Sequence, residues 1–367
     1  MLWLLLIVLI PYIYLLLKIY RNLRKAVPFS SQSQSELFVS IVIACRNEEA
    51  DLPFLLKDLS EQDYYGDSYE VIIVDDNSSD RTAEIVSNFK PIKNLKLLKN
   101  TGRGKKQALR AGILHSKGRL IITADADCRA GSSWLKTISS FYEKNKPCMI
   151  ICPVRLESRS GFLNRFQELE FLSLQGVTAG TALSGDPVMC NGANLAFTKE
   201  IYKKHSENLH DEIVSGDDVF LMLNIKREPG NRILWLESED AIVTTRSSVT
   251  TGAFLHQRAR WVSKAGFYND SKVKLVAIVT FITILLQLFL LAAGIFNPAF
   301  LLIFAAALLL KSIPDFLILN NRACRYKKKS LMRFFLPVQF LYSFYVISVL
   351  GYFLLTRNSY KNSYPAG

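Results

Sequence analysis

The stretch "RLIITADADC", residues 119–128, runs from apolar and β-branched residues directly into two aspartates, Asp125 and Asp127. A continuous apolar run of this kind is typical of a strand that is buried on both faces of a parallel sheet. In an extended segment, residues i and i+2 face the same side, so the two carboxylates converge on one point. With no basic residue between them, we expect this pair to attract a cation.

Upstream of this stretch, apolar strands alternate with amphipathic helices. This alternation predicts an α/β, Rossmann-like domain with a mostly parallel sheet that is covered on both faces by helices. Such sheets bind ligands beyond the carboxyl ends of their strands. The strands are expected at 37–45, 69–76, 95–100 and 119–125, and the helices at 48–60, 79–89 and 105–116.

Acidic and polar residues follow three of these strands, in "CRNEE" (45–49), "DDNSSD" (75–80) and "DADC" (125–128). Because the carboxyl ends of parallel strands meet at one edge of a sheet, we expect these groups to lie together. Oxygen ligands of this kind suit Mg²⁺ or Mn²⁺, which complete their coordination with water and phosphate oxygens. The competing interpretation, solvated acids in turns, fits an isolated D-x-D better than three acidic strand ends.

Four apolar blocks predict about four transmembrane helices. Residues 2–17, 275–294 and 334–355 carry no charge, and each is near the length of roughly 20 residues that spans a bilayer. The fourth block, 299–319, contains Lys311 and Asp315. These two residues are one helical turn apart, so they either neutralise each other or contact the head group of an acceptor.

The basic residues predict the orientation in the membrane. A basic flank at 18–25 follows the first block, which indicates a signal-anchor helix with the N-terminus outside. The loop at 320–333 is also basic, as expected if it returns to the same cytoplasmic side. We therefore expect a multi-pass cell-membrane protein with a cytoplasmic catalytic domain. The net charge of +13 is assigned to a basic face against anionic lipid, so no nucleic acid partner is expected.

The predicted organisation has six parts. The parts are a signal-anchor helix at 1–25, a linker at 26–36, a cytoplasmic catalytic domain at 37–250, an interfacial segment at 251–272, three transmembrane helices at 273–357 and a C-terminal tail at 358–367.

One stretch inside the catalytic domain, 161–176, is amphipathic and either lies on the bilayer or packs on the core. Its apolar face consists of Phe162, Phe166, Leu169, Leu172 and Leu174.

Seven short motifs, in order, make residues 38–262 resemble a known family. The chain is similar to the membrane-bound, inverting family 2 glycosyltransferases that are related to cellulose, chitin and hyaluronan synthases and to ceramide glucosyltransferase. Besides "DAD", the motifs that carry the resemblance are "VSIVIACRNEE" (39–49), "VDDNSSDRT" (74–82), "GRGKKQAL" (102–109), "CNGANLAF" (190–197), "SGDDVFL" (215–221) and "QRARW" (257–261).

The resemblance implies a GT-A fold, a nucleotide-diphosphate sugar donor and a divalent metal, Mg²⁺ or Mn²⁺. It implies Asp127 as the direct metal ligand, with Asp125 nearer the nucleotide. It implies Asp218 as the catalytic base beside Asp217, and Gln257, Arg260 and Trp261 as the Q-x-x-R-W residues. The other implied positions are the donor-binding residues Arg46, Asn47, Glu48, Asp75, Asp76 and Lys105, and the acceptor-side residues Gly192, Ala193 and Asn194.

The expected reaction is a single displacement in which one carboxylate takes the proton of the acceptor hydroxyl. The leaving diphosphate needs positive charge, for which Arg260, Lys105 and Arg258 are candidates. The acceptor is expected to be a membrane-associated lipid or a short glycan. Three alternatives stay open: a processive polysaccharide synthase subunit, a non-catalytic membrane scaffold, and a purely interfacial role for the "QRARW" segment.

Overall fold

The computed structural model describes residues 2–31, 35–210, 213 and 215–362. Within that range the chain forms two compact units, which are described separately. The sheet unit comprises 26–157 and 182–246, and the helical unit comprises 1–25, 158–181 and 247–367. Residues 32–34 of the expected linker and 363–367 of the expected tail lie outside the described residues.

The larger sheet of the sheet unit has seven strands among the described residues, in the order β3-β2-β1-β4-β8-β6-β9. β1, β2, β3 and β4 pair in parallel, while β8 runs antiparallel to both β4 and β6. The predicted mixed α/β architecture with a mostly parallel sheet is therefore confirmed. The strands are β1 (Val39–Cys45), β2 (Tyr69–Asp75), β3 (Leu95–Lys99), β4 (Leu120–Ala124), β6 (Met149–Ile151), β8 (Asn194–Thr198) and β9 (Ile233–Trp235).

A smaller sheet of the same unit joins β5 (Arg129–Ala130), β10 (Val243–Thr245) and β7 (Val154–Leu156). β10 lies between the other two strands, antiparallel to β5 and parallel to β7. Since β5 begins two residues after Asp127, this sheet brings the end of β10 close to the D-x-D segment.

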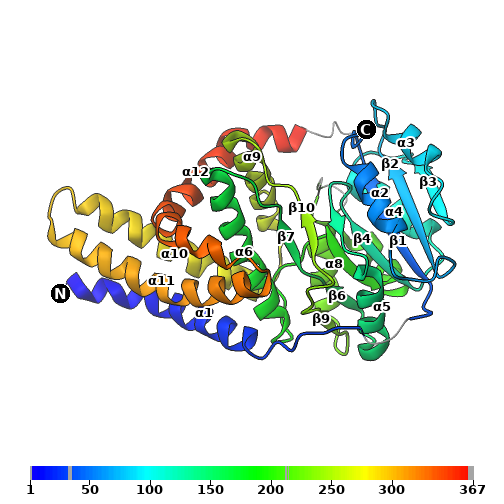
Figure 1. The fold of residues 1–367 in the computed structure, drawn as a ribbon. Coiled ribbons are helices and arrows are strands. Elements are labelled where there is room, and N and C mark those ends of the chain that lie inside the picture. The colour runs from blue at the N-terminus through cyan, green and yellow to red at the C-terminus, as the bar shows by residue number, and fades with distance from the viewer. Residues whose placement is uncertain (1, 32–34, 211–212, 214, 363–367) are drawn as a thin grey trace. The chain divides into compact units, whose positions relative to one another are not determined.

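Helices cover the large sheet because their apolar residues recur at helical spacing. α4 lies against β1 and β2 (Figure 1). The approach is close: a Cβ atom at Gly112 would lie 2.5 Å from a methyl carbon of Val42 and 2.9 Å from one of Val74. The helices of this unit are α2 (Leu52–Ser60), α3 (Thr82–Asn88), α4 (Lys105–His115), α5 (Trp134–Asn145), α7 (Lys199–His205) and α8 (Asp217–Lys226), with the short 3₁₀ turn η2 (Ser206–Asn208).

In the helical unit, four helical segments are long and apolar enough to cross a membrane, counted over the described residues. They are Leu2–Leu23, Ser271–Ala293, Ala299–Arg325 and Lys329–Thr356, which confirms the predicted four. The elements of this unit are η1 (Leu2–Leu9), α1 (Ile10–Leu23), α6 (Phe162–Ala182), α9 (Thr251–Val262), η3 (Ala265–Phe267), α10 (Ser271–Ala293), α11 (Ala299–Arg325), η4 (Lys329–Phe334) and α12 (Phe335–Asn362).

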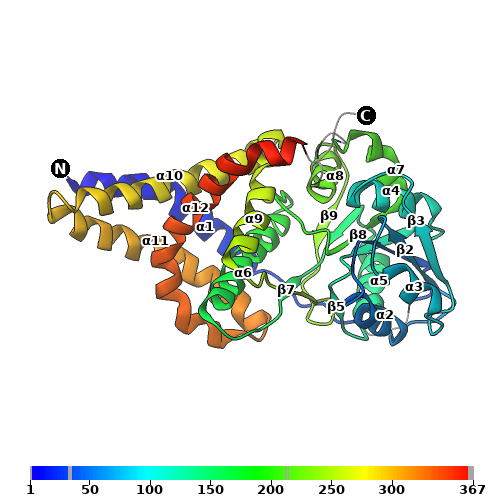
Figure 2. The same ribbon diagram turned by 90° about the horizontal axis from the view of Figure 1, so that it is seen from above.

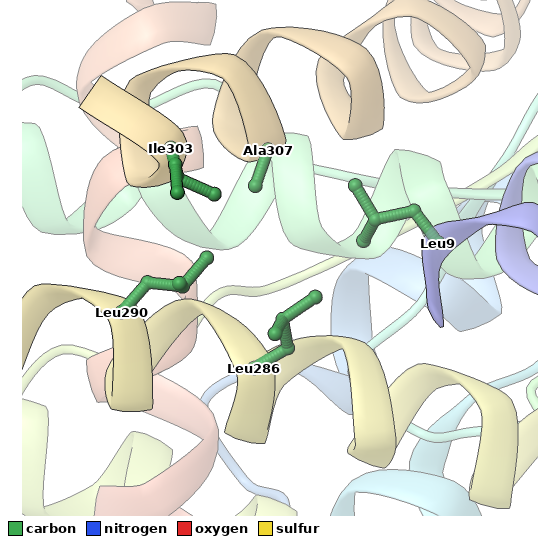
Figure 3. Packing of buried hydrophobic residues seen from close by; sticks show 5 residues of the cluster. All are labelled: Leu9, Leu286, Leu290, Ile303 and Ala307. Carbon is green, nitrogen blue, oxygen red and sulfur yellow. The ribbon is translucent and has the colours of Figure 1, made fainter. Parts of the chain in front are cut away.

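Three of these segments pack side by side, because α1, α10 and α11 contact one another (Figure 1; Figure 2). Figure 3 shows a buried cluster of five residues: Leu9, Leu286, Leu290, Ile303 and Ala307. Aliphatic side chains from η1, α10 and α11 thus pack together in the helical unit.

The charged pair Lys311 and Asp315 of the apolar block 299–319 is neutralised within the helical unit. The Lys311 ammonium lies 2.6 Å from the Asp315 carboxylate and donates to Gln339 Oε1 at 2.7 Å. Tyr12 OH donates to the other oxygen of Asp315 at 2.7 Å. The self-neutralising interpretation of this pair is therefore the one that the structure supports, and the pair links α1, α11 and α12.

The amphipathic stretch 161–176 falls in α6. Phe166, Leu169 and Leu172 are buried, whereas Phe162 is 44% exposed. The middle of the predicted apolar face therefore packs on the protein, as the second of the two open interpretations expected.

Candidate active site

The predicted convergence of strand ends occurs in the sheet unit. Cys45 at the end of β1 pairs with Asp75 at the end of β2, and β4 runs parallel on the other side of β1. The loops beyond β1 and β2 are joined by hydrogen bonds. Asn47 Oδ1 accepts from the Ser79 amide at 2.8 Å, and the Glu48 amide donates to Thr82 Oγ1 at 2.8 Å.

The two aspartates at the end of β2 are nearly buried. Asp76 accepts hydrogen bonds from Asn100 Nδ2 at 2.6 Å and from the Gly104 amide at 3.0 Å. Gly104 has a φ of 84°, a conformation that glycine adopts without strain. Asp76 therefore fastens the turn that begins α4 and so fixes the position of Lys105.

Lys105 forms an ion pair with Asp125. Partial burial opposes the charged form of Lys105, but the charges of Asp125, Asp217 and Asp218 outweigh this effect and raise the pKa of Lys105. The expectation that the D-x-D pair attracts a cation is therefore met at Asp125 by a side chain of the protein itself. Lys105 follows a different strand end, and the fold brings it across to β4. Its ammonium lies in the field of both acidic motifs, "DAD" and "GDD".

Asp127 lacks such a partner among the contacts described and accepts a hydrogen bond from Thr245 Oγ1 of β10 at 2.9 Å. Burial, followed by the charge of Asp125, raises the pKa of Asp127. Burial and then Asp127, Asp51 and Asp125 raise the pKa of Glu48 to about 7. Negative charge is therefore in excess at this strand end.

This excess fits a divalent cation. No group of three or more acidic, histidine or cysteine side chains has a metal-binding arrangement in the part of the chain that the structure describes. Two carboxylates nevertheless suffice for Mg²⁺ or Mn²⁺ when the substrate's phosphate oxygens and water complete the shell. Asp127, with Asp125 next to it, is the donor set that would hold the ion.

The acidic pair Asp217 and Asp218 begins α8, after Gly216 with a φ of 96°. Asp218 accepts from the Gly192 amide at 2.9 Å and from the Val219 amide at 2.8 Å. Burial, followed by the charge of Asp218, raises the pKa of Asp217. A small pocket of about 20 Å³ is lined by the pair, together with Leu109, Leu195 and Tyr202.

The three predicted acceptor-side residues take different places. Gly192 links β4 to Asp218, because its carbonyl accepts from Thr123 Oγ1 on β4 at 3.0 Å while its amide donates to Asp218. Ala193 is buried. The buried Asn194 amide binds protein groups: it donates to the carbonyls of Pro153 and Ala241, and it accepts from Trp134 Nε1. Asn194 therefore shapes the loop from within.

Sequence reasoning missed Lys106, which is 5% exposed. Its ammonium donates to the carbonyls of Leu209, His210 and Ile213 at 2.8, 2.7 and 2.9 Å. This segment leads into the acidic pair, so Lys106 holds the approach to α8. The signal was present in the sequence, because Lys106, Leu109 and Ile113 follow the i, i+3, i+7 spacing of a buried helix face.

The Q-x-x-R-W residues belong to the helical unit, on α9. The structure thus brings the donor-side, metal-side and "GDD" residues together in the sheet unit, and Gln257, Arg260 and Trp261 together on one helix. Arg260 is exposed. Arg258 is buried and paired with Glu170, so it is not available to a diphosphate. Arg46 is exposed beyond β1.

Comparison with known proteins agrees with this architecture. The model of glycosyl transferase family 2 matches residues 40–206. The chain is 27% identical over 241 residues to a beta-monoglucosyldiacylglycerol synthase of Trichormus variabilis. The matched residues cover 64% of this chain and 50% of that protein. It is 26% identical over 239 residues to a poly-beta-1,6-N-acetyl-D-glucosamine synthase of Staphylococcus epidermidis, covering 63% and 55%. The chain thus spans about half the length of these relatives.

Among solved structures, the fold is similar to that of a mannosyltransferase from Pyrobaculum calidifontis in complex with GDP-Man and Mn²⁺. The TM-score is 0.60 and the identity 19%, with 96% of this chain and 99% of the other covered. At this identity the likeness shows the fold, which is of the GT-A type. Together with the family match and the named relatives, it means that residues 40–206 form a domain of the glycosyl transferase family 2 type.

Proposed function

We propose that this protein transfers a sugar from a nucleotide-diphosphate sugar to a membrane-associated acceptor, a lipid or a short glycan, with inversion at the anomeric carbon. The observation that carries the proposal is the position of Lys105. It pairs with Asp125, and the charges of Asp217 and Asp218 also act on it. The donor-side and acceptor-side acids therefore both act on one ammonium, which supports placing the sugar diphosphate beside Lys105.

On the donor side, we assign the nucleotide to the edge formed by Arg46, Asn47, Glu48, Asp75 and Asp76. Asp127, with Asp125, would hold a divalent metal. When bound, that metal supplies positive charge to the leaving diphosphate. Lys105 adds a fixed cation on the same side, which favours the charge that develops as the bond from the anomeric carbon to the phosphate oxygen breaks.

On the acceptor side, we assign Asp218 as the general base. Its carboxylate takes the proton of the acceptor hydroxyl while that oxygen attacks the anomeric carbon, and the nucleoside diphosphate leaves from the opposite face. Gly192 holds Asp218 in place through its amide. Gln257, Arg260 and Trp261 are assigned to the acceptor and the leaving diphosphate, with the indole as an apolar platform for a sugar ring.

The acceptor class rests on two arguments. Four helical segments are long and apolar enough to cross a membrane, which favours an acceptor that is itself associated with the membrane. The beta-monoglucosyldiacylglycerol synthase among the relatives favours a lipid as that acceptor. The poly-beta-1,6-N-acetyl-D-glucosamine synthase favours the second candidate, a processive polysaccharide synthase subunit. Product mass separates them, because one added sugar differs from a ladder. We further propose that the sheet unit is cytoplasmic and the N-terminus outside.

The test of the base is a comparison of Asp218→Asn with Asp217→Asn in purified protein. The first variant should lose transfer by at least about a hundredfold, the scale of general-base catalysis, and should still bind the nucleotide. Turnover of Asp218→Asn within twofold of wild type, or loss in Asp217→Asn alone, would refute the assignment of Asp218.

A further inference from the structure

Within the helical unit, the "QRARW" segment contains a buried ion pair that the proposed reaction does not use. Arg258 and Glu170 are each 5% exposed. Arg258 donates to both carboxylate oxygens of Glu170, from Nε at 2.9 Å and from Nη2 at 2.6 Å. Tyr345 OH of α12 donates to the same carboxylate at 3.0 Å. The pair therefore connects α6, α9 and α12.

The remaining contacts of Arg258 reach two Q-x-x-R-W side chains. Its third guanidinium nitrogen, Nη1, donates to Gln257 Oε1 at 2.5 Å. Its guanidinium carbon lies 4.1 Å from the centroid of the Trp261 ring and 4.7 Å from that of Phe254. One planar group thus binds the acid on one side, the Gln257 amide on another and the indole across its face.

We propose that Glu170 and Arg258 are positioning residues, which fix the orientation of the Gln257 amide and the Trp261 indole for sugar transfer. This inference rests on the proposed function, because it takes Gln257 and Trp261 as the side chains that meet the acceptor. Glu170 acts only through Arg258, and neither residue meets the substrate.

The geometry favours orientation over stability as the purpose of the pair. A buried ion pair is weak evidence for stability, because desolvating two charges offsets their attraction. A guanidinium has donors in a fixed fork and a flat face, so it holds a carboxylate, an amide and a ring at once; an ammonium does not. Arg258→Lys would keep the charge and lose this geometry.

The chain offers a matched control two residues away. Glu168, also on α6 and nearly buried, pairs with Lys328 at 2.5 Å, and that lysine lies outside the "QRARW" segment. Glu170→Gln and Glu168→Gln are the same substitution on the same helix. The first breaks the pair with Arg258, and the second breaks the pair with Lys328 and a further pair with Arg165 at 3.1 Å. Both should lower thermal stability, and only Glu170→Gln should disturb Gln257 and Trp261.

The experiment uses the full chain in detergent and two readouts. The first is the emission of Trp261 alone, obtained as the difference between each variant and the same variant carrying Trp261→Phe. We expect Glu170→Gln and Arg258→Lys to change its emission maximum or its acrylamide quenching, and Glu168→Gln to leave both unchanged. This readout needs no acceptor or donor.

The second readout is nucleoside diphosphate release from the best donor of the wild-type protein, per nucleotide-binding site. We expect kcat to fall about tenfold to a hundredfold in Glu170→Gln and Arg258→Lys, as for a misplaced catalytic group. The donor affinity of these variants, and the kcat of Glu168→Gln, should stay within about threefold of the wild-type values. Equal effects of Glu170→Gln and Glu168→Gln, or a change in Trp261 emission without loss of kcat, would overturn the inference. A wild-type protein that releases no nucleotide would refute the proposed function instead, and the emission readout would still decide whether the pair orients Trp261.

Discussion

Two adjacent lysines at the start of α4 should behave in opposite ways when each is replaced by methionine. Lys106 is buried and donates to three main-chain carbonyls ahead of α8. Each carbonyl left without a partner costs about 1–3 kcal/mol. Relief of the buried ammonium's desolvation offsets several kcal/mol of this sum, which leaves a net loss of about 3 kcal/mol. Lys105 is 41% exposed and contacts Asp125, so its loss should affect function more than local stability.

Amide hydrogen exchange of the full chain, resolved by segment, measures this directly. A loss of about 3 kcal/mol corresponds to roughly a hundredfold faster exchange through local opening, which we expect at the first turns of α8 in Lys106→Met. Lys105→Met should leave this exchange within about threefold of wild type and should weaken nucleotide binding. Exchange in α8 that is unchanged in Lys106→Met, or accelerated equally in both variants, would refute the assigned role of Lys106.

Three further predictions concern the two units separately. Burial favours a higher pKa for Glu70, but the hydrogen bonds that its carboxylate accepts, led by that from Lys96, outweigh burial and hold the pKa below its usual value. The contribution of Glu70 to stability is therefore present above the unfolded-state pKa near 4.5 and is lost as the pH falls through the lower folded-state pKa. Glu70→Gln should flatten the acid limb of a plot of unfolding temperature against pH, and an unchanged limb would contradict this. In the helical unit, Lys311→Met should lower the unfolding temperature, because it leaves the Asp315 carboxylate without its cation and breaking a buried pair costs about 3–5 kcal/mol. Adding Asp315→Asn should restore part of the lost unfolding temperature, because removing both charges costs less than removing one. Additive losses in the double variant would argue against an energetic coupling between the two residues. Gly112→Ala should destabilise the sheet unit by about 1–3 kcal/mol through overpacking of α4 on two strands, and a neutral result in chemical denaturation would show that the helix shifts freely.

Much of the sheet unit follows from local sequence pattern. Apolar runs and helical spacing predict the strands through β4 to within two residues of their observed bounds, because burial on both faces leaves a continuous apolar run. The clustering of acids at strand ends also follows, since parallel strands end at one edge. The four membrane-crossing segments follow from their length and apolarity alone.

The pairings across long sequence separations do not follow from pattern. Lys105 and Asp125 are 20 residues apart, and Glu170 and Arg258 are 88 residues apart. Which cation meets which acid is decided by tertiary packing, and a single sequence offers many equally charged candidates. For the same reason, the sequence made Arg258 and Arg260 equal candidates for the cation that meets the diphosphate. In the structure Arg258 is buried against α6 and paired with Glu170, whereas Arg260 is exposed.

The most direct test of the proposed function is metal-dependent release of nucleoside diphosphate by the full chain in nanodiscs. A panel of UDP- and GDP-sugars is incubated with and without Mg²⁺ or Mn²⁺, in the presence of diacylglycerol or polyprenyl phosphate, and release is compared between wild type and Asp127→Ala. We predict release from one donor, dependent on the metal and lost in Asp127→Ala, with a labelled product one sugar heavier than its lipid. Release that is independent of metal and equal in the variant, or the absence of both release and nucleotide binding in the wild type, would contradict it.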